Sequence, residues 1–235
     1  MNWELLGTYG PRMLGGLVVT IELVTLSIIL GGMLALPIAF ARMSRIAPLR
    51  WVSYAYVYAV RGTPLLAQTF LVYYGAGQFR PELQAIGLWW LFRDAFFCCV
   101  LTFTLNTAAY QAEIYRGAIR AVPRGQWEAA ASLGLGRLAV LRHIILPQAF
   151  RIALRPLGNE IVLMIKGSSV AAIVTVFDLM GETRLAFSRS FDFQVYLWAA
   201  VLYLALVETL RRVIDIIEKR MTRHIHPASS APKTG

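Results

Sequence analysis

Five long apolar segments constrain this 235-residue chain more than any other feature of its sequence. They cover residues 16–41, 54–75, 95–112, 157–177 and 194–213, and each is 18 to 26 residues long. A helix needs about 20 mostly apolar residues to cross the hydrocarbon core of a bilayer. The sequence therefore predicts an all-α integral membrane protein with five transmembrane helices.

The composition supports a membrane protein over a soluble one. Charged residues make up 15% of the chain and hydrophobic residues 57%, whereas a soluble domain carries roughly 25% charged residues. In a soluble protein the net charge of +10 would suggest nucleic-acid binding, but with so few charges we expect a lipid bilayer and no nucleic acid as partner. The only cysteines, Cys98 and Cys99, are adjacent in an apolar run and are expected to be buried small hydrophobes.

The chain ends and the second apolar segment need separate arguments. The first segment is too long for a signal sequence and lacks a basic flank, so we expect a retained span preceded by an interfacial lead segment, residues 1–15. Starting the second span after Pro64 would leave only about 12 residues, or about 18 Å of helix. We therefore expect one span from Tyr54 to Gly75, with Arg61 within it or at its rim. The membrane domain covers residues 16–219, and the polar tail, residues 220–235, is expected to be cytoplasmic and disordered.

Basic residues are concentrated on alternate loops. Residues 42–51, 116–155 and 211–235 hold 16 Lys and Arg, whereas residues 1–12, 75–94 and 177–194 hold 5. Loops rich in Lys and Arg stay in the cytoplasm. We expect the N-terminus outside and the C-terminus inside, as five spans require.

Six charged side chains fall in the predicted spans or at their ends: Glu22, Arg61, Glu113, Glu160, Lys166 and Glu208. Those near span ends can extend to the interface. Glu160 and Lys166 lie deeper and are about 240° apart around a helix, so they cannot pair with each other. Each needs another helix, a cavity or a ligand as its partner.

The long loop over residues 116–155 contains a short predicted helix. Pro123 and Gly125 precede it, residues 126–133 are strong helix formers, and Gly134 and Gly136 permit a tight turn. A short helix bounded by turns on a cytoplasmic loop presents one face to a soluble partner.

The same loop carries a recognisable motif. Glu128-Ala129-Ala130, Gly134, Ile144 and Leu146-Pro147 match the pattern EAA-x3-G-x9-I-x-LP in residue and spacing. The chain thereby resembles the membrane subunits of type I ABC importers. The stretches RGTPLL at 61–66, AAYQAEIYRGAI at 108–119 and NEIVLMIKGSS at 159–169 resemble the polar amino acid branch of that family. More loosely, the chain is similar to the M-type subunit of histidine, lysine/arginine/ornithine and opine importers.

This resemblance implies a fold, a location and partners. It implies the five-helix type I importer fold with a cytoplasmic coupling helix, as a multi-pass protein of the bacterial inner membrane. The implied partners are a second membrane subunit (a Q-type paralogue rather than a second copy), two cytoplasmic ATPase subunits and an extracytoplasmic amino-acid-binding protein. The chain lacks a G-x-x-x-x-G-K-[ST] phosphate loop. We therefore expect no enzyme activity, metal or cofactor on this chain, with ATP and Mg²⁺ held by the ATPase.

The resemblance also assigns the coupling residues. Residues 116–155 become the coupling loop, and its ATPase-coupling set is Gly125, Glu128, Ala129, Ala130, Gly134, Ile144, Leu146 and Pro147. One alternative stays open for Glu128, because an acid near a helix N-terminus also stabilises the helix dipole.

The substrate pathway is argued from chemistry. An amino acid needs a donor for its carboxylate, an acceptor for its ammonium group and, if it is basic, a further carboxylate. The polar candidates on the spans are Asn159, Glu160, Lys166, Ser168, Ser169, Arg61, Gln68 and Asn106. We expect Glu160 to bind the ammonium group or a cationic side chain; the alternative is an interhelical polar network that fixes packing. Gly167 and the two serines should weaken their helix, and Arg61 either pairs with an acid such as Glu113 or acts as a gate.

Two other function classes compete with an importer subunit. A self-sufficient secondary carrier or channel is disfavoured, because five spans without an internal repeat do not suit an inverted-repeat carrier. A membrane-embedded enzyme is disfavoured because the spans show no nucleophile–base pair, metal cluster or carboxylate dyad.

Overall fold

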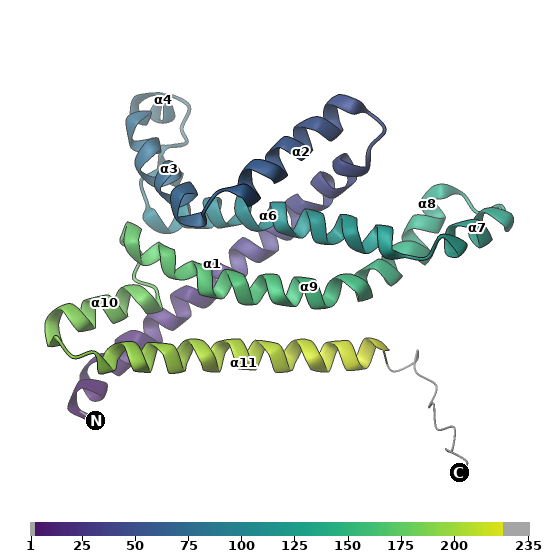
Figure 1. Ribbon diagram of the computed structural model, residues 1–235. Helices are drawn as coiled ribbons and strands as arrows, with labels where there is room; N and C mark the ends of the chain where they lie inside the picture. Colours follow the sequence, from purple (N-terminus) through teal and green to yellow (C-terminus); the bar gives the residue numbers. More distant parts are fainter. Residues whose placement is uncertain (1–2, 223–235) are drawn as a thin grey trace, which may run out of the picture.

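The computed structural model describes residues 3–222, which form helices and no strands. The expected all-α architecture is confirmed. The long helices are α1 (Trp3–Met43), α6 (Ala95–Ala121), α9 (Leu146–Gly167) and α11 (Gln194–Thr222). Helices α6, α9 and α11 lie side by side, and α1 crosses them obliquely (Figure 1). The shorter elements are α2 (Ala47–Gly62), α3 (Leu65–Gln78), α4 (Arg80–Ala85), α5 (Trp89–Phe92), α7 (Arg124–Ser132), α8 (Arg137–Val140), the π-helix η1 (Leu141–Ile145), the 3₁₀ helix η2 (Ser168–Val174) and α10 (Leu179–Ser190).

Small residues let α1 and α6 approach each other closely. A side chain at Gly31 would collide with the methyl group of Thr107. Further along the same contact, Ala35, Ala39 and Ala112 form a buried cluster. Small residues at a helix–helix contact allow the two backbones to come near, so polar atoms of α6 can reach the carbonyl groups of α1.

The largest buried cluster joins α1, α6, α9 and η2 through residues such as Leu23, Phe103, Met164 and Val174. Cys98 and Cys99 are both fully buried and free. The prediction that they act as small buried hydrophobes is confirmed.

The expected continuous helix over residues 54–75 is replaced by two helices, α2 and α3. Thr63 has an extended backbone, with φ −116° and ψ 146°, because the residue before a proline is disfavoured in the helical region. Pro64 also lacks the N–H that would bond to the Val60 carbonyl group. The two helices diverge from this break (Figure 1).

The expected separate lead segment, residues 1–15, is also corrected, because α1 runs without interruption from Trp3 to Met43. Packing explains the continuity. Met13 is buried with Leu179 and Ala199, and a Cβ atom on Gly16 would lie 2.7 Å from the Asp178 carbonyl oxygen. These contacts hold the first turns of α1 in line with the rest despite Pro11.

Within the described residues, three helical stretches are long and apolar enough to cross a membrane: Glu4–Met43, Ala95–Ala121 and Arg137–Val174. Helices α2 and α3 have only 16 and 14 residues. Helix α11 has 29 residues, but its charge-free stretch ends at Glu208. The five-span topology thus stays a prediction. The predicted disordered tail, apart from its first residues in α11, lies outside the described residues.

Candidate functional site

A cavity of about 490 Å³ opens where the break between α2 and α3 faces α6 and α9. Three of the predicted pathway residues line it: Arg61 at the end of α2, Asn106 on α6 and Glu160 on α9. Tyr110 and the backbone of the break complete the polar part of its wall. The structure thus brings together residues that are 45 and 54 positions apart in the sequence.

Glu160 is the most deeply placed charge of this cavity, with 6% of its surface exposed. Its Oε1 atom accepts a hydrogen bond of 2.9 Å from the Thr107 hydroxyl group on α6. Within residues 3–222, no donor reaches its other carboxylate oxygen, Oε2. A carboxylate with one oxygen held and one available can bind a cationic group that enters the cavity.

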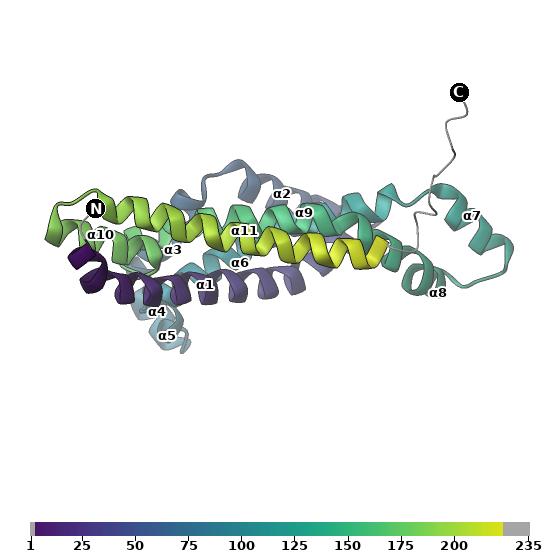
Figure 2. The ribbon, with the colours of Figure 1, turned by 90° about the horizontal axis from the view of Figure 1, so that it is seen from below.

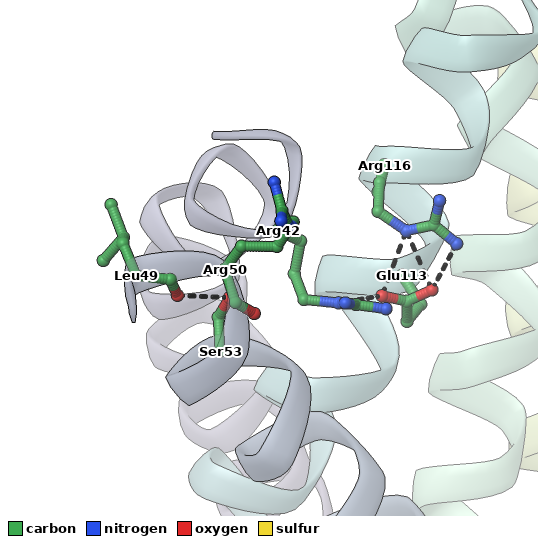
Figure 3. A network of polar contacts seen from close by, with 6 residues as sticks. All are labelled: Arg42, Leu49, Arg50, Ser53, Glu113 and Arg116. Carbon is green, nitrogen blue, oxygen red and sulfur yellow. Dashed lines mark hydrogen bonds and ion pairs between the residues drawn. The ribbon is translucent and has the colours of Figure 1, made fainter. Parts of the chain in front are cut away.

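Arg61 does not pair with Glu113, so that alternative is wrong. Glu113 is instead held from two sides, by Arg42 at 2.9 Å and by Arg116 at 2.6 Å (Figure 3). Two guanidinium groups already satisfy this carboxylate. The Arg61 guanidinium lies over the ring of Tyr110, 5.0 Å from its centroid, which is cation–π geometry.

A second cavity, of about 290 Å³, is lined by Arg42, Tyr54, Tyr58 and Glu113. Arg61 and Tyr110 line this cavity as well as the larger one. The Arg61–Tyr110 stack therefore stands between the two cavities, a place from which a side chain can control passage.

Gln68 closes the break between α2 and α3. Its Nε2 atom donates to the Val60 carbonyl oxygen at 2.7 Å and to the Thr63 hydroxyl oxygen at 2.8 Å. Its Oε1 atom accepts from Asn106 Nδ2 at 3.0 Å. The carbonyl group that Pro64 frees is thus occupied by this chain's own side chain, and Gln68 does not line the cavity.

The other candidates on α9 and at the start of η2 lie outside the cavity wall. Asn159 and Lys166 are exposed. Ser168 and Ser169 begin the 3₁₀ helix η2, and their hydroxyl groups donate to the carbonyl oxygens of Ile165 and Lys166 in α9, at 2.8 and 2.9 Å. The predicted weakening of the helix is confirmed, since α9 ends at Gly167 and a 3₁₀ helix follows.

Sequence reasoning missed Thr107, Gln111 and Tyr115, which form a hydrogen-bonded row behind Glu160. Thr107 and Gln111 are buried, and Tyr115 is half-buried. Their signal was present, because they are spaced four residues apart along the sequence. Residues at this spacing share one face of a helix.

In the coupling loop, helix α7 projects beyond the bundle at the end where α6 finishes (Figure 1). The motif residues divide into two groups. Ala130 is 2% exposed, and Ile144 and Leu146 pack with it against the buried cluster at the base of the loop. Gly125, Glu128, Ala129, Gly134 and Pro147 are exposed. The first group holds the loop in place, and the second remains available to a partner.

Gly134 ends α7 in a left-handed conformation, with φ +70°. The N–H of Leu135 donates to the Ala130 carbonyl oxygen at 3.2 Å, and that of Gly134 donates to Ala131 at 3.0 Å. This pair of bonds is the Schellman motif. A Cβ atom on Gly134 would meet nothing within 4 Å, so within this chain the turn requires the backbone freedom of glycine.

Two leucines of the loop were also missed. Leu133 and Leu138 are each 77% exposed. Their signal was the alternation of glycine and leucine in SLGLGRL, residues 132–138. Large apolar side chains exposed on a polar loop are typical of a docking surface.

A second buried carboxyl group, that of Asp178, lies at the start of α10. Its Oδ1 atom accepts from the Gly181 N–H at 2.9 Å, and the neighbouring Leu179 N–H donates to the Thr20 hydroxyl oxygen at 3.1 Å. Burial raises the pKa of Asp178 from 3.8 to about 6. The carboxyl group acts as the N-cap of α10.

Known proteins share both the sequence and the fold. The family described as "Binding-protein-dependent transport system inner membrane component" matches residues 27–223. The nopaline transport system permease protein NocM of Agrobacterium fabrum is 36% identical over 99% of this chain and 98% of its own length. The L-cystine transport system permease protein TcyB of Bacillus subtilis is 39% identical over 95% of this chain and 92% of its own length. The arginine ABC transporter permease protein ArtM of Escherichia coli is 36% identical over 90% of this chain and 95% of its own length.

A solved structure described as an amino acid ABC transporter with histidines superposes with a TM-score of 0.83 at 33% identity. The match covers 94% of this chain and 99% of that one. An inward-facing MetNI methionine ABC transporter shares the fold, with a TM-score of 0.73 at 18% identity.

Proposed function

Because the chain belongs to the binding-protein-dependent transport system inner membrane components, and is the permease subunit of an amino acid ABC importer, we propose that its 490 Å³ cavity is the substrate site. The single observation that carries this proposal is the free oxygen of buried Glu160 in a cavity that Arg61 also lines. The cavity volume falls within the roughly 300–1,000 Å³ of small-molecule sites.

The substrate class follows from the charges. The ammonium group or the cationic side chain of an amino acid binds Glu160, and its carboxylate binds Arg61, with Asn106 as a further polar contact. A basic or polar amino acid such as histidine, arginine, lysine or ornithine, or an opine, fits this arrangement. The relatives named for nopaline and arginine transport support this choice.

The proposed topology has five spans in the bacterial inner membrane. They are α1, the α2–α3 pair, α6, α9 with η2, and α11, with the N-terminus outside and the C-terminus in the cytoplasm. Two observations support it. The start of α1 and the end of α11 lie at opposite ends of the bundle, and α7 lies at the end where α11 finishes (Figure 2). The basic loops follow the same division.

The proposed assembly contains a second membrane subunit, a Q-type paralogue rather than a second copy, together with two ATPase subunits and an extracytoplasmic binding protein. The exposed residues of α7 and the turn at Gly134 support docking of an ATPase on the coupling loop. ATP and Mg²⁺ bind on the ATPase chain. Closure of the two ATPases moves the coupling loops together and opens the spans outward, and hydrolysis reverses this change.

Reconstituted transport tests the substrate site. The complex is purified with its copurifying chains, which mass spectrometry identifies, and uptake of arginine is measured against the ATP hydrolysed. Glu160→Gln should raise the KM for arginine at least tenfold, because a charge-assisted hydrogen bond is lost. Glu208→Gln is the matched control, since Glu208 is exposed on α11 and, within residues 3–222, forms its one ion pair with Arg212. An unchanged KM in Glu160→Gln would refute the site.

A further inference from the structure

Behind Glu160, three side chains of α6 form a chain of hydrogen bonds that all point the same way. The Tyr115 hydroxyl group donates to Gln111 Oε1 at 3.1 Å, and Gln111 Nε2 donates to Thr107 Oγ1 at 3.1 Å. The Thr107 hydroxyl group then donates to Glu160 Oε1 at 2.9 Å. Every donor faces toward the carboxylate.

The orientation of Gln111 is fixed from α1. Its Nε2 atom also donates to the Ile28 carbonyl oxygen at 3.1 Å, and a carbonyl oxygen can only accept. The nitrogen of the amide therefore faces Ile28 and Thr107. Since Thr107 Oγ1 accepts this N–H, its own proton is directed to Glu160, and the hydroxyl group has no reason to rotate away.

Two adjacent glycines of α1 make room for this chain. A Cβ atom on Gly32 would lie 3.0 Å from Gln111 Oε1, and one on Gly31 would collide with Thr107. Gln111 is 3% exposed and Thr107 is fully buried. Thr107 and Gln111 are therefore shielded from solvent, whereas Tyr115 is half-buried. The hydrogen-bond chain ends at Glu160, in the proposed substrate cavity.

We propose that Gln111 is a positioning residue that sets substrate specificity, because through Thr107 it keeps one oxygen of Glu160 occupied and leaves the other for a cationic group in the cavity. This inference rests on the proposed substrate site. The arrangement selects ligands with an ammonium or guanidinium group, because the oxygen of Glu160 that Thr107 leaves free accepts hydrogen bonds from such donors. It excludes a role for Thr107 and Gln111 as packing residues alone.

The test compares matched variants in the reconstituted complex. Thr107→Val removes the donor to Glu160, and Gln111→Met removes the N–H that orients this donor. Each should raise the KM for arginine about tenfold, with kcat within about twofold. Thr107→Ser keeps the hydroxyl group and should stay within about twofold of the unmodified protein. Thr102→Val is the control on the same helix, since Thr102 is buried and donates only to the Cys98 carbonyl oxygen of α6; it should leave KM unchanged.

The same changes in the Glu160→Gln background separate the two hypotheses. If Gln111 acts through Glu160, Thr107→Val and Gln111→Met should have no further effect on KM there. Additive effects would overturn the inference and assign the chain to packing. A raised KM in Glu160→Gln with an unchanged KM in Thr107→Val and Gln111→Met would also overturn it while the substrate site stands. An unchanged KM in Glu160→Gln would overturn the substrate site and this inference with it.

Discussion

Glu160 and Glu128 are both central to the proposed transport cycle, yet they lie in opposite surroundings. Glu160 is 6% exposed and accepts a hydrogen bond from a neighbouring helix. Glu128 is exposed on α7, and the structure records no ion pair for its carboxylate within the described residues. The cavity is thus specified by side chains that this chain supplies itself, whereas the coupling loop has a fixed backbone and an open surface for a partner.

The largest expected effect concerns the backbone of the coupling loop. Gly134→Val should lower ATP-driven transport at least tenfold, because a β-branched residue at φ +70° costs about 1–3 kcal/mol and distorts the end of α7. Amino acid uptake measures the loss of transport, and copurification of the ATPase measures the loss of docking. Gly134→Asn is the matched variant, since asparagine tolerates the left-handed region, and it should keep most of the transport. Loss of the subunit from the membrane in Gly134→Val would contradict a coupling defect.

The next prediction concerns the cavity side of the comparison, at the break between α2 and α3. Gln68→Leu should lower the free energy of unfolding by about 2 kcal/mol, because the Val60 carbonyl group and the Asn106 amide lose their partner. Pro64→Ala in the same background restores an N–H for Val60 and should recover about half of this loss. Denaturation of the purified subunit measures both, and Gln78→Leu at the exposed end of α3 is the control. Equal stability of the single and double variants would contradict the role of Gln68.

Asp178 is a buried carboxyl group outside the proposed substrate cavity, and it should make the free energy of unfolding depend on pH. Its pKa in the folded chain is about 6 against an ordinary 3.8, so folding favours the protonated form. The stabilisation is complete below pH 4 and is lost as the pH rises through about 6, by about 3 kcal/mol in total and about 1 kcal/mol between pH 5 and 7.

Asp178→Asn should remove this pH dependence while keeping the cap, because asparagine caps a helix as well as aspartate. The thermal midpoints of both proteins at pH 5 and pH 7 give the comparison. Parallel changes in the two proteins would show that the pH dependence arises elsewhere.

How far the sequence predicted the site depends on the range of the interactions. The turn at Gly134 and the weakened end of α9 are local, and motif spacing and composition predicted both. Glu160 and Arg61 were expected on the pathway because a charge in an apolar span needs a partner, and both line the same cavity.

The interactions that the sequence did not reveal depend on register between helices. Whether Gln111 meets the Ile28 carbonyl group depends on how closely Gly31 lets α6 approach α1. Gln68 reaches Val60 only because the chain breaks fully at Pro64. Helical periodicity within one segment cannot indicate either distance, since each is set by the packing of two segments.

The smallest expected effect on the fold belongs to the exposed leucines of the coupling loop. Leu133→Ser and Leu138→Ser should change the free energy of unfolding by less than about 0.5 kcal/mol, because each side chain is 77% exposed. If these side chains form the docking surface, the same changes should weaken ATPase copurification severalfold and lower transport with it. Ala130→Ser in the same loop alters a residue that is 2% exposed. It should lower the free energy of unfolding more than it weakens ATPase docking, because it buries a hydroxyl group. Normal ATPase binding by the variant that carries both Leu133→Ser and Leu138→Ser would place the docking surface on α7 itself, around Glu128 and Ala129. Only α7, and not the turn that follows it, would then be the open surface that differs from the cavity.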